Sequence, residues 1–91
     1  MIKWGIIGAG HIAQRFAKSL IHSNQGKLYA VASHTDTKLG LFKEEYPGIS
    51  TYTDYMQLLE DENVDVVYIA LRHKDHYKWS KEALLHKKNT N

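Results

Sequence analysis

Hydrophobic residues in this chain fall into short apolar runs that alternate with stretches of helical periodicity. The runs at residues 1–7, 27–33, 49–52 and 64–71 are rich in β-branched, aromatic and small apolar residues, so we expect four strands. The last run, Val-Asp-Val-Val-Tyr-Ile-Ala-Leu, is nearly continuous in β-branched and aromatic residues. Such continuity is typical of a central parallel strand that is buried on both faces.

Between and after these runs, apolar residues recur at spacings of three and four, which predicts helices that each bury one face. The first helix should begin at His11 and end near Asn24, and the fourth should end near His86 with Trp79, Ala83 and Leu84 turned inward. The expected N-terminal caps are Asp36 or Thr37 for the second helix, Thr53 or Asp54 for a brief third helix, and Asp75 for the fourth.

This alternation of strands and helices predicts an α/β fold with right-handed crossovers. The arrangement that fits is a partial Rossmann fold, with four parallel strands in the order 3-2-1-4 and helices on both faces of the sheet. No internal repeat or linker divides the chain, so residues 1–91 are expected to form one domain. The polar tail at residues 87–91 is expected to be frayed.

A glycine-rich turn follows the first predicted strand and opens the first predicted helix. Residues 8–13, Gly-Ala-Gly-His-Ile-Ala, match the pattern G-x-G-x-x-A. Gly8 permits the tight turn, Gly10 lets a pyrophosphate approach the backbone, and Ala13 lets the helix pack on the strand. The helix N-terminus presents free N–H groups to the phosphates, so we predict a dinucleotide site that includes Gly8, Ala9, Gly10, His11 and Ile12. The alternative is that these small residues only make a tight turn.

The end of the second strand bears on the choice of cofactor. Folds that prefer NAD place an acidic residue there to bind the ribose 2′-hydroxyl, whereas this chain has Ser33-His34-Thr35. Ser33, His34 and Lys38 together can hold a 2′-phosphate, which favours NADP over NAD. Asp36 lies slightly further on and can reach back to a ribose, and His34 and Lys38 can also be ordinary surface residues.

Composition excludes several other functions. The chain is 43% hydrophobic and 24% charged, as is ordinary for a globular protein. Twelve basic against ten acidic residues, without a basic run, give little support for nucleic-acid binding. There is no cysteine, which excludes thiolate catalysis and cysteine-ligated metals, and no apolar run approaches the length of a membrane helix. We therefore expect a cytoplasmic domain that neither enters a membrane nor binds nucleic acid.

The six histidines do not predict a metal site. His73 and His76 are three residues apart, but no carboxylate pair lies near them to complete a set of ligands. These two histidines, with Tyr77, are instead the candidate acid–base groups near the end of the fourth strand, since imidazole titrates near neutral pH.

Several segments resemble the N-terminal domain of the Gfo/Idh/MocA oxidoreductases. The opening Lys-Trp-Gly-Ile-Ile-Gly-Ala-Gly-His-Ile-Ala at residues 3–13 carries the strongest likeness. Residues 28–33, 52–59 and 63–70 are similar to its second strand, short helix and fourth strand, and the pattern at 76–84 is similar to the next helix. The likeness covers nearly the whole chain in the same order, which makes it more specific than the glycine motif alone.

The resemblance implies an NAD(P)-dependent dehydrogenase that acts on sugars, polyols or dihydrodiols. In this family a nucleotide-binding domain precedes a larger substrate domain, and a lysine in a Glu-Lys-Pro motif assists proton transfer. The resemblance adds the loop after the fourth strand to the cofactor site. That loop comprises Ala70, Leu71, Arg72, His73 and His76, where Leu71-Arg72 replaces the common Thr-Pro and His76 is retained.

The Glu-Lys-Pro motif does not occur in residues 1–91. We therefore expect a truncated dinucleotide-binding domain without its substrate domain, catalytically incomplete by itself, with His76 as the one weak candidate for catalysis. A small-molecule substrate is expected only if a second domain is supplied. Without strands five and six, residues 64–71 should form an exposed edge, so we also expect a homo-oligomer through that edge. The alternative is a non-catalytic nucleotide-binding or self-associating module.

Overall fold

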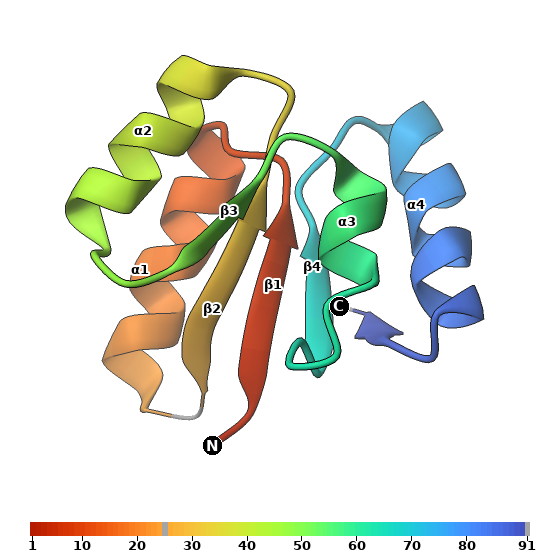
Figure 1. Cartoon of the computed structure of the whole chain (residues 1–91), viewed down its shortest axis with the longest axis horizontal. Helices are drawn as coiled ribbons and strands as arrows, with labels where there is room; N and C mark the ends of the chain where they lie inside the picture. Colours follow the sequence, from red (N-terminus) through yellow and green to blue (C-terminus); the bar gives the residue numbers. More distant parts are fainter. Residues whose placement is uncertain (25, 91) are drawn as a thin grey trace.

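The computed structural model describes residues 1–24 and 26–90, which form an alternating series of strands and helices (Figure 1). Asn91, at the end of the predicted frayed tail, lies outside the described residues. The elements of the described residues are β1 (Lys3–Ile7), α1 (His11–Ser23), β2 (Lys27–Ala32), α2 (Asp36–Glu45), β3 (Ser50–Tyr52), α3 (Tyr55–Leu59), β4 (Val66–Ile69), α4 (His73–Leu85) and β5 (Asn89–Thr90).

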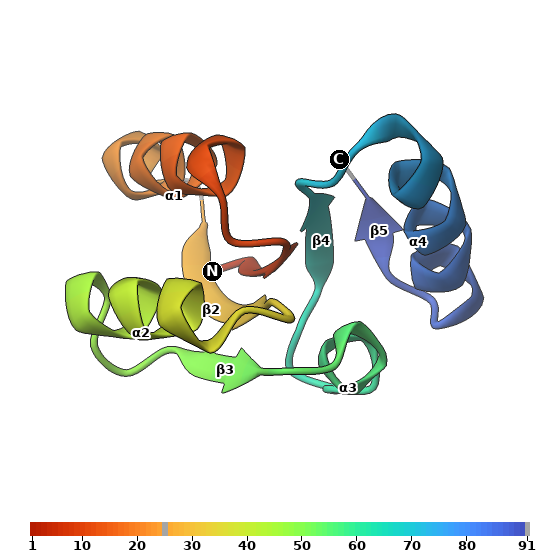
Figure 2. The same ribbon diagram turned by 90° about the horizontal axis from the view of Figure 1, so that it is seen from above.

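The strands form one parallel sheet in the order β3-β2-β1-β4-β5. Figure 2 shows α1 and α2 on one face of this sheet and α3 and α4 on the other. The predicted α/β class, the order of the first four strands and the helices on both faces are therefore confirmed. None of the helices in the described part of the chain has the length and apolar character that crossing a bilayer requires.

Two hydrophobic cores fill the space between the sheet and its two layers of helices. Ile6 belongs to the core under α1 and α2, and Ile7 belongs to the core under α3 and α4. Both side chains are fully buried, because successive residues of a strand point to opposite faces of the sheet. The continuous apolar run of β1 is thus explained by burial on both faces.

Helix starts differ from the prediction in two places. The fourth helix begins at His73 with Arg72 as its N-cap, so Asp75 lies in its first turn, where a carboxylate is favourable without capping. Thr35, and not Asp36 or Thr37, is the N-cap of α2. The prediction for α3 is confirmed, because the Asp54 side chain accepts a hydrogen bond from the Met56 N–H at 3.0 Å.

The C-terminal end of α4 and the tail that follows it also differ from the prediction. Leu84 is 63% exposed, because Ala83 takes the inward position and the next helical residue is turned about 100° away. Asn89 and Thr90 pair with the first half of β4 as a fifth strand, so the sheet has five strands and not four. The tail is therefore not frayed over its described part, and the edge of β4 from which we predicted self-association is covered over its first half.

Buried Lys88 explains why the polar tail is ordered. Its side chain is only 9% exposed, and Nζ donates hydrogen bonds to the carbonyl oxygens of Asp61 and Val64, each at 2.7 Å. Lys87 turns the chain with a left-handed φ of 61°, which brings Lys88 under the turn that precedes β4. The same turn is held by Tyr52, whose hydroxyl donates to the Asp61 carboxylate at 2.6 Å, and this hydrogen bond and partial burial raise the pKa of Tyr52 to about 12.

Replacing Lys88 with methionine should lower the free energy of unfolding by about 2 kcal/mol, because two buried carbonyl oxygens lose their donor. Lys87→Met is the matched control, since it removes the same charge from an exposed side chain and should change stability by less than about 0.5 kcal/mol. Urea unfolding of the two variants measures the difference. Equal stabilities would contradict the role given to the Lys88 ammonium group.

Candidate functional site

An open cleft lies where the carboxyl ends of β1, β2 and β4 meet, at the top of Figure 1. It has a volume of about 380 Å³. The strand order reverses direction at β1, and the crevice at such a point is where open parallel sheets bind ligands. The lining residues come from the ends of these strands and the helices beside them: Gly8, Ala9, Gly10, Ser33, His34, Thr35, Lys38, Tyr55, Ala70, Leu71, Arg72 and Asp75.

Gly8 joins three strands at the floor of the cleft. Its φ of +104° lies in a region that side chains disfavour, and a Cβ there would come within 2.5 Å of the Ala70 carbonyl oxygen. Its N–H donates to the Ala32 carbonyl at 2.8 Å, while the Ala70 N–H donates to the Ile7 carbonyl at 2.8 Å. The role of Gly8 is thus to let the end of β1 pass between the ends of β2 and β4.

Unlike Gly8, Gly10 could carry a side chain without a clash with any of the described residues. Its φ is −87°, which any residue can adopt, and a Cβ there would meet no atom within 4 Å. Gly10 is also the N-cap of α1, where no side chain caps the helix and the first turn carries no acidic residue. The free N–H groups of α1 and the space over Gly10 together form a backbone cradle that fits an anionic group.

The end of β2 adds polar and basic groups to the cleft. Ser33 is buried, and its Oγ accepts a hydrogen bond from the Thr35 N–H at 3.1 Å, which fixes the loop between β2 and α2. His34 and Lys38 are exposed at the mouth of the cleft, and Arg72 lies on the side of β4 and α4. Because these three side chains are basic, this part of the cleft suits a second anionic group.

The loop after β4 reaches the cleft although Leu71-Arg72 replaces the Thr-Pro of the family pattern. The Leu71 side chain lies 3.2 Å from the position that a Cβ of Gly8 would take, so it covers the floor of the glycine turn. Arg72 caps the start of α4 with an extended backbone. The replacement therefore places a cationic side chain, Arg72, at the cleft.

Nine of the predicted cofactor residues line the cleft: Gly8, Ala9, Gly10, Ser33, His34, Lys38, Ala70, Leu71 and Arg72. Four do not: His11, Ile12, His73 and His76. We had expected His73 to precede the fourth helix, but it is the first residue of α4. His76, the candidate acid–base group, is exposed on α4, with its Nδ1 3.3 Å from the Ser80 hydroxyl oxygen. Described residues hold no group of three side chains that could ligate a metal ion.

Thr35, Tyr55 and Asp75 line the cleft and were missed from the sequence. The spacing of Tyr55, Leu58 and Leu59 shows that α3 buries this tyrosine, but it does not show at which end of the sheet the ring lies. In the structure Tyr55 is 9% exposed, and burial, with a smaller effect of the Asp75 charge, raises its pKa. Tyr55 could have been predicted as a cleft residue from its position at the start of a helix that follows the end of a strand.

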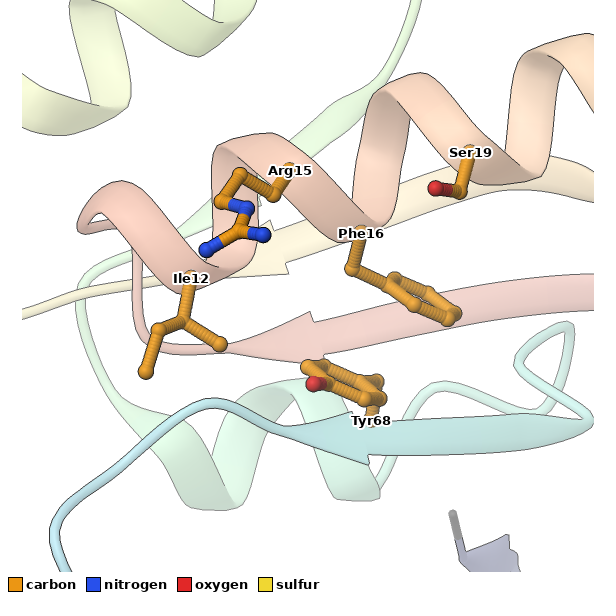
Figure 3. Close-up of a pocket in the computed structure, with 5 residues that line it drawn as sticks. All are labelled: Ile12, Arg15, Phe16, Ser19 and Tyr68. Atoms are coloured by element: carbon orange, nitrogen blue, oxygen red, sulfur yellow. The ribbon is translucent and has the colours of Figure 1, made fainter.

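A second hollow, of about 350 Å³, lies along α1 and the face of β4 (Figure 3). The rings of Phe16 and Tyr68 are stacked there, with centroids 4.0 Å apart and planes within 3°. Ile12, Arg15 and Ser19 also line this hollow, whereas Gly8 and Gly10 line the cleft. This hollow therefore lacks the backbone cradle of the cleft, and Ile12 belongs to it instead.

Known proteins resemble this chain over nearly its whole length. A family of oxidoreductases with an NAD-binding Rossmann fold, GFO_IDH_MocA, matches residues 2–90. D-xylose 1-dehydrogenase (NADP(+)) of Hypocrea jecorina is 34% identical over 97% of this chain and 26% of its own length. Trans-1,2-dihydrobenzene-1,2-diol dehydrogenase of Mus musculus is 34% identical over 82% of this chain and 23% of its own length. The chain thus spans about a quarter of these relatives.

Solved structures share the fold. Scyllo-inositol dehydrogenase from Lactobacillus casei, with bound NAD(H) and scyllo-inositol, superposes with a TM-score of 0.90 and 25% identity, over 99% of this chain and 27% of that one. KijD10, a 3-ketoreductase from Actinomadura kijaniata in complex with NADP and TDP-benzene, gives a TM-score of 0.86 and 31% identity, over 98% of this chain and 27% of that one. Structures with this arrangement of strands and helices therefore hold NAD(H) in one case and NADP in the other.

Proposed function

Because the chain belongs to the Gfo/Idh/MocA oxidoreductases and is their NAD(P)-binding Rossmann domain, we propose that its cleft binds NADP in preference to NAD. The observation that carries this proposal is the pairing of a backbone cradle at Gly10 with basic side chains at the end of β2. The cradle suits the pyrophosphate that NAD and NADP share, and the basic side chains suit the phosphate that only NADP carries.

Each part of the cofactor has a matching part of the cleft in this proposal. Gly8, Ala9 and Gly10 hold the pyrophosphate together with the backbone at the start of α1, which includes His11 and Ile12. Ser33, His34 and Lys38 hold the ribose 2′-phosphate. Ala70, Leu71 and Arg72 guide the nicotinamide half, whose bound ring supplies the hydride acceptor or donor.

Among the described residues, no acidic side chain lines the β2 side of the cleft, and this supports the preference for NADP. The lining residues from this side are Ser33, His34, Thr35 and Lys38, whereas Asp36 is exposed on α2 and Asp75 belongs to α4. A carboxylate next to the ribose would accept hydrogen bonds from a 2′-hydroxyl and repel a 2′-phosphate. The residues present instead attract the phosphate.

The activity we propose for the whole protein is hydride transfer between this cofactor and a sugar, polyol or dihydrodiol. Support comes from the relatives named above, which act on D-xylose and on a dihydrodiol. Residues 1–91 supply the cofactor half of that reaction, since the Glu-Lys-Pro motif that assists proton transfer is not among them. We also propose a cytoplasmic location, because a chain without cysteine is typical of a reducing compartment.

Calorimetric titration with NADPH and, separately, NADH tests the proposal. The protein should bind NADPH at micromolar concentration and NADH more weakly. His34→Asp should lower the affinity for NADPH by about tenfold or more and leave or improve that for NADH, because a carboxylate replaces a basic ring beside the 2′-phosphate.

His22→Asp is the matched control, because it makes the same change of residue at the far end of α1. It should leave both affinities within about twofold, the change expected from a distant surface charge that salt screens. Equal affinities for the two cofactors would contradict the NADP preference. Absence of binding at millimolar concentration would contradict cofactor binding itself.

A further inference from the structure

Three aromatic rings from three different elements lie in a row beside the cleft. The His34 ring, in the loop after β2, lies flat on the Tyr55 ring of α3, with centroids 4.2 Å apart and planes within 10°. The Tyr55 ring meets the edge of the Trp79 ring of α4 at 5.0 Å and 85°. We call His34, Tyr55 and Trp79 the ring series.

Tyr55, the middle ring of the ring series, is the most buried of the three. Trp79 is half-buried, Tyr55 is 9% exposed and packs in the core under α3 and α4, and His34 is exposed. Within the described residues, no hydrogen bond occupies the ring nitrogens of His34, so the stack on Tyr55 is what restricts its side chain. A stacked pair of this kind contributes about 0.5–1.5 kcal/mol of stability in addition to the energy gained from burying its surface.

We propose that Tyr55 is a positioning residue that holds the His34 imidazole at the cleft for the 2′-phosphate of NADP, and so determines cofactor specificity. This inference rests on the proposed function. An unstacked surface histidine would lose rotamer freedom on binding the phosphate, and that loss weakens binding. A ring already restricted by Tyr55 has lost that freedom before the cofactor arrives.

The test compares Tyr55→Leu with Tyr55→Phe. Leucine removes the stack and should weaken NADPH binding by about fivefold to tenfold, the equivalent of the stacking energy, and should weaken NADH binding less. Phenylalanine keeps the ring and removes only the hydroxyl, so it should restore NADPH binding to within about twofold of the wild type. Circular dichroism of the leucine variant verifies its fold.

His34 variants separate positioning from a general packing effect. His34→Ala and His34→Phe should each weaken NADPH binding, the second because a stacked phenyl ring has no nitrogen to offer. Adding Tyr55→Leu to His34→Ala should cause no further loss, since Tyr55 acts through His34. Should Tyr55→Leu prove unfolded, Tyr55→Met takes its place, because it also removes the stacked ring and should weaken NADPH binding more than Tyr55→Phe does.

Two results would overturn the inference while leaving the proposed function intact. One is an equal loss of NADPH and NADH affinity in Tyr55→Leu, and the other is an additive loss in the double variant. Failure of the wild-type protein to bind either cofactor would instead overturn the proposed function, and the inference with it.

Discussion

Replacing Gly10 with valine should abolish NADPH binding without unfolding the protein. The backbone of Gly10 has a φ of −87° and an extended ψ, a conformation that valine adopts readily, and a Cβ there would meet no atom of the protein within 4 Å. The added methyl groups would instead fill the space in which we place the pyrophosphate. We expect a loss of affinity of about 100-fold or more, equivalent to about 2.7 kcal/mol. The free energy of unfolding should fall by only about 1 kcal/mol, because valine is a poorer N-cap than glycine.

Gly40→Val provides the matched control for Gly10→Val. A Cβ at Gly40 would also meet no atom within 4 Å, but this glycine lies on the exposed side of α2, away from the cleft. It should therefore leave the affinity for NADPH unchanged. Calorimetry of both variants, with circular dichroism to verify the fold, makes the comparison, and wild-type affinity in Gly10→Val would refute the placement of the pyrophosphate.

Replacing Gly8 with alanine should have the opposite outcome, a large loss of stability. A Cβ at Gly8 would lie 2.5 Å from the Ala70 carbonyl oxygen, a backbone atom that cannot move aside without disturbing the end of β4. The φ of +104° adds strain for any residue with a side chain. We expect the free energy of unfolding to fall by about 3–4 kcal/mol, which is a large fraction of the total for a domain of this size.

Gly48→Ala isolates the contribution of the close contact. Gly48 has a φ of +95°, but a Cβ there would meet nothing within 4 Å. The free energy of unfolding of this variant should therefore fall only by the cost of the backbone conformation, about 1–2 kcal/mol. Urea unfolding of the two alanine variants should show the larger loss for Gly8, and equal losses would show that the packing of β1 against the end of β4 is not what Gly8 serves.

The fold could be predicted because each long element carried its own periodic signal. Ile6 and Ile7 are adjacent and both fully buried, as is typical of a strand covered on both faces. The fifth strand could not be predicted in this way, because Asn89 and Thr90 are exposed and contribute no hydrophobic pattern. Its order depends on the buried ammonium group of Lys88, and a lysine in a polar tail ordinarily indicates a solvated side chain.

The sequence could predict mainly those cleft residues that directly follow a strand. The glycine turn, Ser33 and Ala70 each follow a strand directly, and the ends of parallel strands meet at one edge of the sheet. Tyr55 was missed because its spacing indicates burial and nothing more. His76 was expected at the cleft by resemblance, but α4 begins at His73, so His76 stands one turn into the helix and outside the lining residues.

The central claim, that the glycine turn of this chain binds a dinucleotide phosphate, is tested most directly by a nuclear magnetic resonance titration. Backbone amide resonances of the isotope-labelled protein would be followed as NADPH is added. We predict that the amides of Gly8, Gly10, His34 and Leu71 shift, while those of Phe16 and Tyr68 at the second hollow stay in place. Shifts confined to Phe16 and Tyr68, or no shifts at millimolar NADPH, would contradict the account.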